Sequence, residues 1–394
     1  MKNRVFILIL FLLTFLGEFV KGENGLFVRR EGVQFKLNGK EFYRNGFNAY
    51  WLMYEASFPS ERQKVTNVFQ EAASYSLTIA RTWAFSDGGS RPLQSSPGVY
   101  NEQMFQGLDF VISEAKKHGI KLILSLVNNY NDYGGRQQYI KWANLSKEDD
   151  FYTNPIVKGF YKNHIKNVLT RVNTITKVAY KDEPTIMAWE LINEPRCSSD
   201  LSGRTFQGWV NEMASYLKSI DGNHLLEIGL EGFYGSSTPD KIKINPNSYQ
   251  FGTDFIANNQ IPAIDFVTVH SYPDQWLKNA PGSAQLAFLK QWVDQHIADS
   301  QNILRKPVIF AEFGKSYKVA GYTQADRDRF YRLIYDDIYS SASKGGAGSG
   351  GLFWQLLSEG MDNYRDGYEI VLKQSGFLGK LIYAESRKLS ILGR

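Results

Sequence analysis

Short apolar runs alternate with longer amphipathic stretches along most of this 394-residue chain. Eight runs have the length and composition of buried strands, and they lie at residues 42–47, 77–82, 121–126, 185–189, 225–229, 266–269, 307–311 and 350–353. Helical patterns lie between many of them, at residues 61–74, 103–117, 155–178, 207–220, 284–299 and 325–340. This alternation predicts a parallel sheet whose strands are connected by helices.

The number of strands predicts that the sheet is closed. Eight strand and helix units, spaced roughly 35 to 65 residues apart, fit an α/β fold built as a single (β/α)8 TIM barrel. Residues 32–43 begin before the first strand and alternate around Asn38 and Gly39, a pair that favours tight turns, so we expect a small N-terminal β-hairpin cap. No linker rich in Pro, Ser or Thr divides the sequence, and we expect one domain over residues 23–394.

The first residues have the layout of a secretory signal peptide. Lys2 and Arg4 precede an apolar run over residues 5–16, and Gly22 ends a short segment before the polar Glu23. A membrane anchor is the alternative, but about a dozen apolar residues is short for a span, which needs about twenty. We therefore predict a leader over residues 1–22, secretion to an extracellular location, and no membrane-spanning segment.

Composition and charge indicate which kinds of molecule the protein binds. The formal charge of +5 is a mild excess that does not indicate nucleic acid and fits a neutral substrate. Aromatic residues make up 14% of the chain, a supply that suits a groove for sugars. Cys197 is the only cysteine, so no intramolecular disulfide can form. Asn144 begins the sequon Asn-Leu-Ser and is a predicted glycosylation site.

The histidines do not predict a metal site. His118, His164, His224 and His296 are scattered over helix ends and interiors, and the sequence has neither an HExxH pattern nor a pair of cysteines. It also has no Gly-x-Ser-x-Gly elbow, which argues against a serine nucleophile. We expect no metal and no other cofactor.

Polar and aromatic side chains follow six of the eight predicted strands at the carboxyl end, which is the active face of a TIM barrel. Among them, Glu194 and Glu312 follow the fourth and seventh strands. These strands face each other across an eight-stranded barrel, so the two side chains can converge above its centre. Carboxylates about 5 to 5.5 Å apart serve retaining glycoside hydrolysis, and a wider gap with room for water serves inversion. The sequence leaves this distance open.

The neighbours of the two glutamates favour unequal roles. Arg81, if it reaches Glu312, would keep that carboxylate ionised as a nucleophile requires, and Tyr272 could donate a further hydrogen bond. A salt bridge without a catalytic role is the alternative for Arg81. Glu194 lies in an apolar setting that would raise its pKa and let it donate a proton, while Asn193 could hold a sugar 2-hydroxyl.

Aromatic residues at the strand ends could form the stacking walls of a sugar groove, and they are Trp51, Trp83, Tyr130, Trp276 and Trp354. Packing in the core is the alternative for each of them. The remaining carboxylate of the fourth strand, Glu190, is expected to be a supporting or structural group inside the barrel mouth.

Longer motifs carry a resemblance to glycoside hydrolase family 5 and, within it, to plant endo-β-1,4-mannanases. The segments are FSDGGSRPLQ, YNEQMFQGLDF, SLVNNY, WELINEPRC, GLEGFYG, DFVTVHSYPDQW and NYRDGYEIVL, spread over essentially the whole mature chain. The resemblance implies that Glu194 is the acid/base and Glu312 the nucleophile of a catalytic domain over residues 23–394. It also implies a supporting and substrate-binding set of Arg81, Trp83, Asn129, Asn193, His270, Tyr272 and Trp354. Asn129 stands where many members of the family have a histidine, a departure shared by mannanase-type relatives.

The activity implied by the resemblance is internal hydrolysis of β-1,4-mannosidic bonds in mannan, galactomannan and glucomannan, through a covalent mannosyl-enzyme. We expect a monomer in the cell wall or apoplast whose partner is this polysaccharide. Two alternatives stay open, and they are transfer of the glycosyl group to another sugar chain and a barrel that binds carbohydrate without catalysis.

Overall fold

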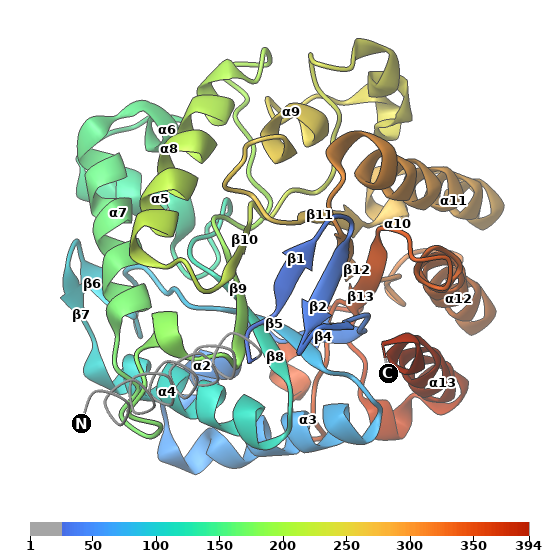
Figure 1. Cartoon of the computed structure of the whole chain (residues 1–394), viewed down its shortest axis with the longest axis horizontal. Helices are drawn as coiled ribbons and strands as arrows, with labels where there is room; N and C mark the ends of the chain where they lie inside the picture. The colour runs from blue at the N-terminus through green and yellow to red at the C-terminus, as the bar shows by residue number, and fades with distance from the viewer. Residues whose placement is uncertain (1–25, 394) are drawn as a thin grey trace, which may run out of the picture.

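The computed structural model describes residues 26–393 and shows parallel strands surrounded by helices (Figure 1). The eight-stranded sheet consists of β4 (Gly46–Asn48), β5 (Ile79–Trp83), β8 (Lys121–Ser125), β9 (Ile186–Glu190), β10 (Leu225–Glu227), β11 (Val267–Ser271), β12 (Val308–Phe313) and β13 (Gly348–Phe353). Its order is β10-β9-β8-β5-β4-β13-β12-β11. The backbone N–H of Asp265 donates to the carbonyl of Leu226 over 2.8 Å and joins the two end strands. The predicted (β/α)8 barrel is confirmed.

The longer helices cover the outside of this barrel (Figure 1). The helices are α2 (Leu52–Ala56), α3 (Arg62–Ser74), α4 (Glu102–Lys117), α5 (Gly135–Trp142), α6 (Asp150–Thr153), α7 (Pro155–Thr170), α8 (Arg204–Ile220), α9 (Phe255–Asn259), α10 (Pro273–Trp276), α11 (Gly282–Asp299), α12 (Gln324–Ala342) and α13 (Gly376–Leu392). All six predicted helices are present. The prediction that the third extends to residue 178 is wrong, because Arg171 and Thr174 turn away to bind the buried Asp109.

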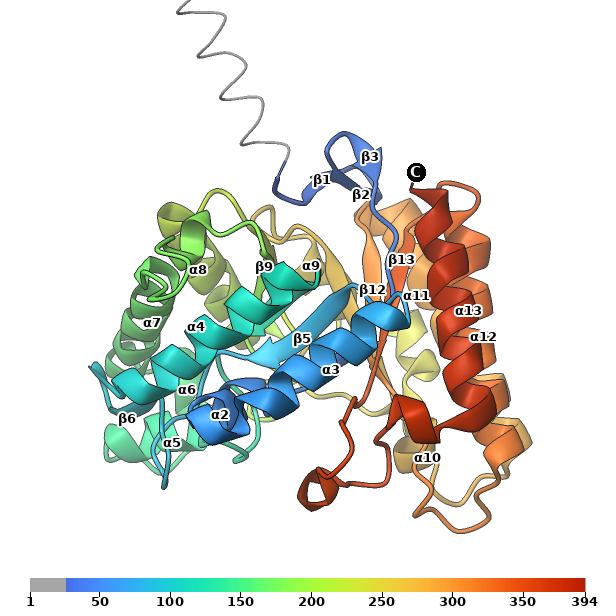
Figure 2. The same cartoon turned by 90° about the horizontal axis from the view of Figure 1, so that it is seen from below.

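A small antiparallel sheet precedes the barrel, and it is formed by β1 (Arg29–Glu31), β2 (Gln34–Leu37) and β3 (Lys40–Glu41). Asn38 and Gly39 have φ angles of 54° and 75° at the turn between β2 and β3, as the sequence predicted. Figure 2 shows the sheet at one end of the barrel. The Phe35 ring packs edge-on against Phe266 at 5.2 Å, just before β11, so the sheet seals the amino end of the barrel.

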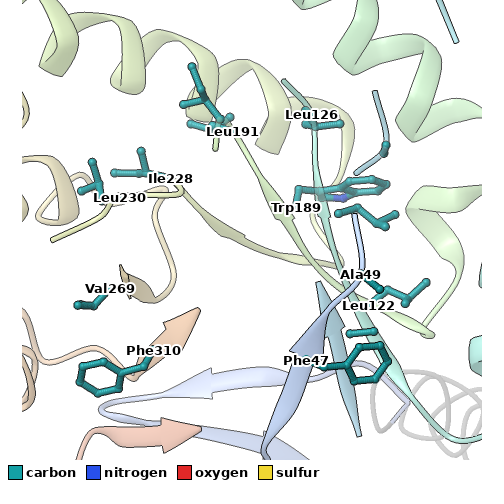
Figure 3. Close-up of a cluster of buried hydrophobic side chains, with 14 of the residues drawn as sticks. Phe47, Ala49, Leu122, Leu126, Trp189, Leu191, Ile228, Leu230, Val269 and Phe310 are labelled. Carbon is teal, nitrogen blue, oxygen red and sulfur yellow. The ribbon is translucent and has the colours of Figure 1, made fainter. Parts of the chain in front are cut away.

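Alternation along the strands separates two buried layers. Leu122 and Leu124 of β8 pack in the larger layer between strands and helices. Figure 3 shows part of this layer, including Leu122. Ile123 of β8 and Ile79 of β5 belong instead to the smaller cluster inside the barrel and under the cap. Arg81 lies two residues after Ile79 and therefore points into the barrel as well.

No helix among residues 26–393 is long and apolar enough to cross a membrane. The predicted signal peptide over residues 1–22 lies outside the described residues. The cap, the barrel and its loops make up residues 26–393.

Candidate active site

A cavity of about 620 Å³ opens at the carboxyl ends of the strands. Its lining includes both predicted carboxylates together with several predicted neighbours, namely Trp83, Tyr130, Asn193, Glu194, Tyr272, Trp276, Glu312 and Trp354. Arg81 and His270 lie behind this wall and are almost completely buried. Side chains that follow different strands therefore meet at one end of the barrel, although they are far apart in the sequence.

Glu312 is held by two donors on the floor of the cavity. Arg81 Nη1 donates to Glu312 Oε1 over 2.5 Å, and the Tyr272 hydroxyl donates to Oε2 over 2.7 Å. These are the two contacts expected from the sequence. Burial raises the pKa of Glu312, while His270, Arg81 and the Tyr272 hydrogen bond act in the opposite direction.

Arg81 connects Glu312 to a second carboxylate deeper in the barrel. Its Nε and Nη2 atoms donate to the two oxygens of Glu190 over 2.5 and 2.7 Å. It also donates to the side-chain oxygens of Asn193 and Asn48, over 2.6 and 3.0 Å. Arg81 is thus fixed from four directions, and Glu190 occupies the supporting position that the sequence predicted. Such a fixed guanidinium can present one N–H to Glu312 without rearranging.

Glu194 reaches the cavity from the loop after β9. Its φ angle of 49° is unusual for a residue with a side chain, and its backbone N–H donates to the carbonyl of Gly229 over 2.9 Å. Glu194 Oε1 lies 2.6 Å from His270 Nδ1. Burial raises the pKa of Glu194, as expected for a proton donor, although Arg196 and Arg81 oppose the shift.

His270 stands beside Glu312 in the register of β11 and β12, with Nδ1 3.7 Å from Glu312 Oε2. Burial lowers the pKa of His270, so a neutral ring is favoured near pH 7. A hydrogen on Nδ1 can be donated to Glu194 Oε1 whether Glu194 is ionised or carries its own proton on Oε2, because Oε1 accepts in both states. His270 therefore orients Glu194.

The separation of the two carboxylates decides between the retaining and inverting geometries. One oxygen of Glu194, one of Glu312 and a ring nitrogen of His270 all lie within 4.8 Å of one another. Carboxyl groups whose oxygens approach to within this limit fit the roughly 5 to 5.5 Å separation of retaining enzymes better than the roughly 6.5 to 9.5 Å of inverting ones.

The same three groups are the candidate metal ligands among residues 26–393. Two ligands of a tetrahedral zinc ion, each about 2.0 to 2.1 Å from it, would stand about 3.3 Å apart. The 2.6 Å between His270 Nδ1 and Glu194 Oε1 is shorter than that and is a hydrogen-bond distance. The geometry is that of a carboxylate and imidazole pair.

Asn129, like Arg81 and His270, belongs to the predicted substrate-binding set but does not line the cavity. Its side-chain oxygen accepts a hydrogen bond from the backbone N–H of Arg196 over 3.2 Å, and it does not line the cavity. The neighbouring Asn128 lines the cavity instead and accepts a hydrogen bond from Asn193 Nδ2 over 3.0 Å. Asn129, which the resemblance implied, therefore contacts the backbone of the Arg196 loop, and its neighbour Asn128 is the asparagine at the cavity wall.

Aromatic rings form one wall of the cavity. The rings of Tyr50 and Trp354 are stacked at 5.5 Å with an angle of 7°, and Trp83 lies 5.0 Å from Tyr50. Trp354 Nε1 donates to Asp366 over 2.7 Å, which fixes the indole ring. Trp51 is completely buried and belongs to the core, the alternative considered for it.

Several lining residues were not predicted, among them Tyr50, Arg196, Glu231 and Tyr368. Arg196 and Glu231 form a two-pronged ion pair at 2.9 and 2.7 Å. Tyr50 lies two residues after β4 and Glu231 four residues after β10, so a search of the residues that follow each strand could have found them. Tyr368 lies far along the loop after β13, so its distance from the strand gives no indication that it reaches the cavity.

A second cavity of about 510 Å³ adjoins the first, and Tyr133 lines both. Its other walls come from the loops after β5, β8 and β13, including Gly88 to Arg91, Gln137 and Tyr364. Arg91 lies over the Tyr54 ring at 3.3 Å. The hollow surface at the active face is therefore longer than the catalytic cavity alone.

A family model described as GH family 5 β-mannosidase-like matches residues 25–379. The chain belongs to this family. This family 5 chain is 61% identical to mannan endo-1,4-β-mannosidase 7 of Arabidopsis thaliana, over 94% of its own length and 86% of that protein. It is 60% identical to mannan endo-1,4-β-mannosidase 4 of Solanum lycopersicum, with 98% of each chain covered. The resemblance predicted from the motifs is confirmed.

Solved structures give the same result for this family 5 chain. The endo-β-1,4-mannanase of Thermotoga petrophila superposes with a TM-score of 0.79 at 34% identity, covering 90% of this chain and 78% of that one. The endo-1,4-β-mannanase of Rhizomucor miehei also gives 0.79, at 32% identity, covering 93% and 99%. At least 90% of this chain thus superposes on enzymes named for action on mannan.

Proposed function

We propose that the chain is a retaining, endo-acting mannan endo-1,4-β-mannosidase that cleaves internal bonds in mannan, galactomannan and glucomannan. The observation that carries the proposal is the pair Glu194 and Glu312, which bring one oxygen each to within 4.8 Å of the other in a cavity at the active face. The names of its relatives support mannan as the substrate class. They are named as hydrolases, which does not favour a transglycosylase or a barrel without catalysis.

The reaction runs in two displacements. In the first, Glu312 attacks the anomeric carbon, the glycosidic C–O bond breaks, and Glu194 gives its proton to the departing oxygen. In the second, Glu194 removes a proton from water, the water oxygen bonds to the anomeric carbon, and the bond to Glu312 breaks. The product keeps the β configuration, and both carboxyl groups return to their starting states.

The neighbouring side chains prepare the pair for these steps. Arg81 and Tyr272 stabilise the charge on Glu312 before attack and after release, and His270 aims Glu194 at the leaving oxygen. Asn193 is held by Arg81 with its amide at the cavity wall, where it can bind the sugar 2-hydroxyl. The stacked Tyr50 and Trp354 offer flat apolar faces to the sugar rings.

We also propose that the protein is secreted as a monomeric glycoprotein of the cell wall or apoplast. The support is the leader layout of residues 1–22 and the sequon at Asn144. Asn144 is exposed, with a φ angle of 56°, in the loop after α5. The intact mass before and after enzymatic deglycosylation, compared with Asn144→Gln, tests the glycan, and light scattering tests the monomer.

Release of reducing ends from galactomannan tests the catalytic assignment. We expect Glu312→Ala to lower the rate by several orders of magnitude because no covalent intermediate can form. The matched control is Glu31→Ala, which removes an exposed glutamate of the cap at the opposite end of the barrel. Equal activity of Glu312→Ala and the wild type would sink the mechanism. Products longer than the starting manno-oligosaccharide, in excess acceptor, would instead favour transglycosylation.

A further inference from the structure

Two carboxyl groups lie side by side beneath the active site. Glu190 of β9 and Glu227 of β10 are register partners in adjacent parallel strands, and both are completely buried. Neighbouring strands are about 4.8 Å apart, so partnered side chains on the same face touch. Two ionised carboxylates at this distance, away from water, would repel each other strongly, and one proton on the pair relieves the repulsion.

Glu190 is the member that stays ionised. Both of its oxygens accept from Arg81, over 2.5 and 2.7 Å, in the planar two-pronged geometry that suits a carboxylate. Although burial opposes ionisation, Arg81 lowers the pKa of Glu190 to about 2. The proton of the pair therefore belongs to Glu227.

The surroundings of Glu227 fit a neutral acid. Its Oε2 accepts from the Gly229 backbone N–H over 2.5 Å and from the Thr268 hydroxyl over 2.8 Å. Its Oε1 is buried and receives no hydrogen bond from any donor in the described part of the chain. An oxygen that finds no donor is satisfied if it carries a hydrogen and donates it. Burial, with the nearby charge of Glu190, raises the pKa of Glu227 well above its ordinary value.

We propose that Glu227 is a neutral carboxylic acid that donates a hydrogen bond from Oε1 to Glu190 and thereby positions Arg81 against Glu312. Arg81 divides its hydrogen bonds between Glu190 and Glu312. The hydrogen bond from Glu227 partly neutralises the charge of Glu190. Glu190 then attracts Arg81 less strongly, and the interaction of Arg81 with Glu312 becomes stronger. Glu227 does not line the cavity, so it acts through Glu190 and Arg81 and is a positioning residue.

The same substitution at the two neighbours gives opposite results. Glu227→Gln keeps an oxygen for Gly229 and Thr268 and an N–H for Glu190, and we expect kcat/KM to stay within about threefold of the wild type. Glu190→Gln removes the charge that holds Arg81, and we expect a loss of about a hundredfold or more. Glu227→Met keeps the volume but donates nothing, and we expect kcat to fall about tenfold with little change in KM.

A pH profile separates positioning from a general loss of structure. With Arg81 drawn toward Glu190 in Glu227→Met, the pKa of Glu312 rises further, so the acid limb of kcat/KM moves to higher pH. A merely structural role would lower activity equally at every pH. Glu227→Gln should restore the wild-type profile. If Glu227→Gln is as damaged as Glu227→Met, the neutral-acid assignment is overturned.

Infrared difference spectroscopy tests the proton directly, without relying on activity. The inference rests on the proposed role of Glu312, but the protonation of Glu227 does not. The wild type at neutral pH should show a protonated-carboxyl band that is sensitive to ¹³C-labelled glutamate and absent from Glu227→Gln. Because Glu194 and Glu312 can contribute similar bands, Glu194→Gln and Glu312→Gln backgrounds identify the one that belongs to Glu227. A band unchanged by Glu227→Gln in both backgrounds would overturn the inference.

Discussion

Arg81 shows how much of the site depends on one side chain. It enters the barrel from β5 and touches Glu190, Glu312 and Asn193 at once, although these residues are more than a hundred positions away in the sequence. Nε and Nη2 donate to Glu190, Nη2 donates also to Asn193, and Nη1 donates to Glu312. The fork geometry of arginine, and not merely its charge, is what the site requires.

Arg81→Lys tests this requirement. An ammonium group has three N–H donors on a single nitrogen and cannot replace the bonds that Arg81 makes from three nitrogens, so we expect kcat/KM to fall about 10²- to 10³-fold. Loss of the two-pronged bond to Glu190 leaves a buried carboxylate poorly paired, and the unfolding free energy should drop by about 3 kcal/mol. The control is Arg329→Lys on the exposed side of α12, which should stay within about 0.5 kcal/mol. Nearly wild-type kinetics for Arg81→Lys would refute the argument.

The raised pKa of Glu194 sets the alkaline limb of activity. Only the protonated form donates a proton, so kcat/KM should fall as pH rises through that pKa. Glu312 must be ionised, so activity should also fall as pH drops through the pKa of Glu312. Glu194→Gln, assayed on an aryl mannoside whose leaving group needs no proton, should lose the alkaline limb. A limb that persists in this variant would assign it to another group.

At the scale of elements, a contact between the loop after β9 and the loop after β10 fixes the backbone of Glu194. Gly229 follows β10 with a φ angle of 96°, and a Cβ there would lie 1.9 Å from the carbonyl oxygen of Ile192. The Gly229 carbonyl also accepts the backbone N–H of Glu194. The left-handed conformations of Glu194 and Gly229 therefore depend on each other.

Gly229→Ala should damage both stability and activity. The clash is with backbone, which cannot rotate away, so we expect a loss of about 3 kcal/mol or more in unfolding free energy. Because the Glu194 loop must shift, kcat should fall even well below the melting temperature. Gly159→Ala is the matched control, since Gly159 lies exposed in α7 with open space around its Cβ position. It should gain up to about 1 kcal/mol, and chemical denaturation measures both.

The elements also show what the sequence predicts well. All eight strands were found because both faces of a barrel strand are buried, which leaves short runs that are mostly apolar. The end of α7 was missed because it depends on Asp109, a partner far away in the sequence.

The site was predictable where position along a strand determines direction. Glu194, Glu312, Tyr272 and Trp354 all lie at strand ends and all line the cavity. The pairing of Glu190 with Glu227 was not predicted, because it needs the register between two strands as well as their order. Register follows from packing of the whole barrel, and no single stretch of sequence contains it.

At the scale of the whole molecule, the two ends of the barrel have different tasks. The cap seals the amino end with Phe35, which is 1% exposed and packs on Phe266, while the active site occupies the other end. Phe35→Ala should therefore lower the unfolding free energy by about 3 to 5 kcal/mol. At temperatures where the variant is folded, kcat should be unchanged. A changed kcat for a folded Phe35→Ala would show that the ends are not independent.

The length of the hollow surface predicts how activity depends on the length of the substrate. A polysaccharide that fills the catalytic cavity can continue past Tyr133 into the second cavity, where it gains contacts that a short oligosaccharide cannot make. Ser90 lies exposed on the wall of the second cavity. Ser90→Trp fills that space, so we expect kcat/KM on a long manno-oligosaccharide to fall about tenfold, the equivalent of about 1.4 kcal/mol of lost binding.

The shortest cleavable oligosaccharide, which occupies only the catalytic cavity, should react with Ser90→Trp as it does with the wild type. Ser95→Trp is the matched control, because Ser95 is exposed on the neighbouring strand β6 (Gln94–Ser96) but lines neither cavity. It adds the same ring without filling the space and should affect neither substrate. If Ser90→Trp slows long and short substrates equally, the second cavity does not bind the chain, and the groove ends at Tyr133.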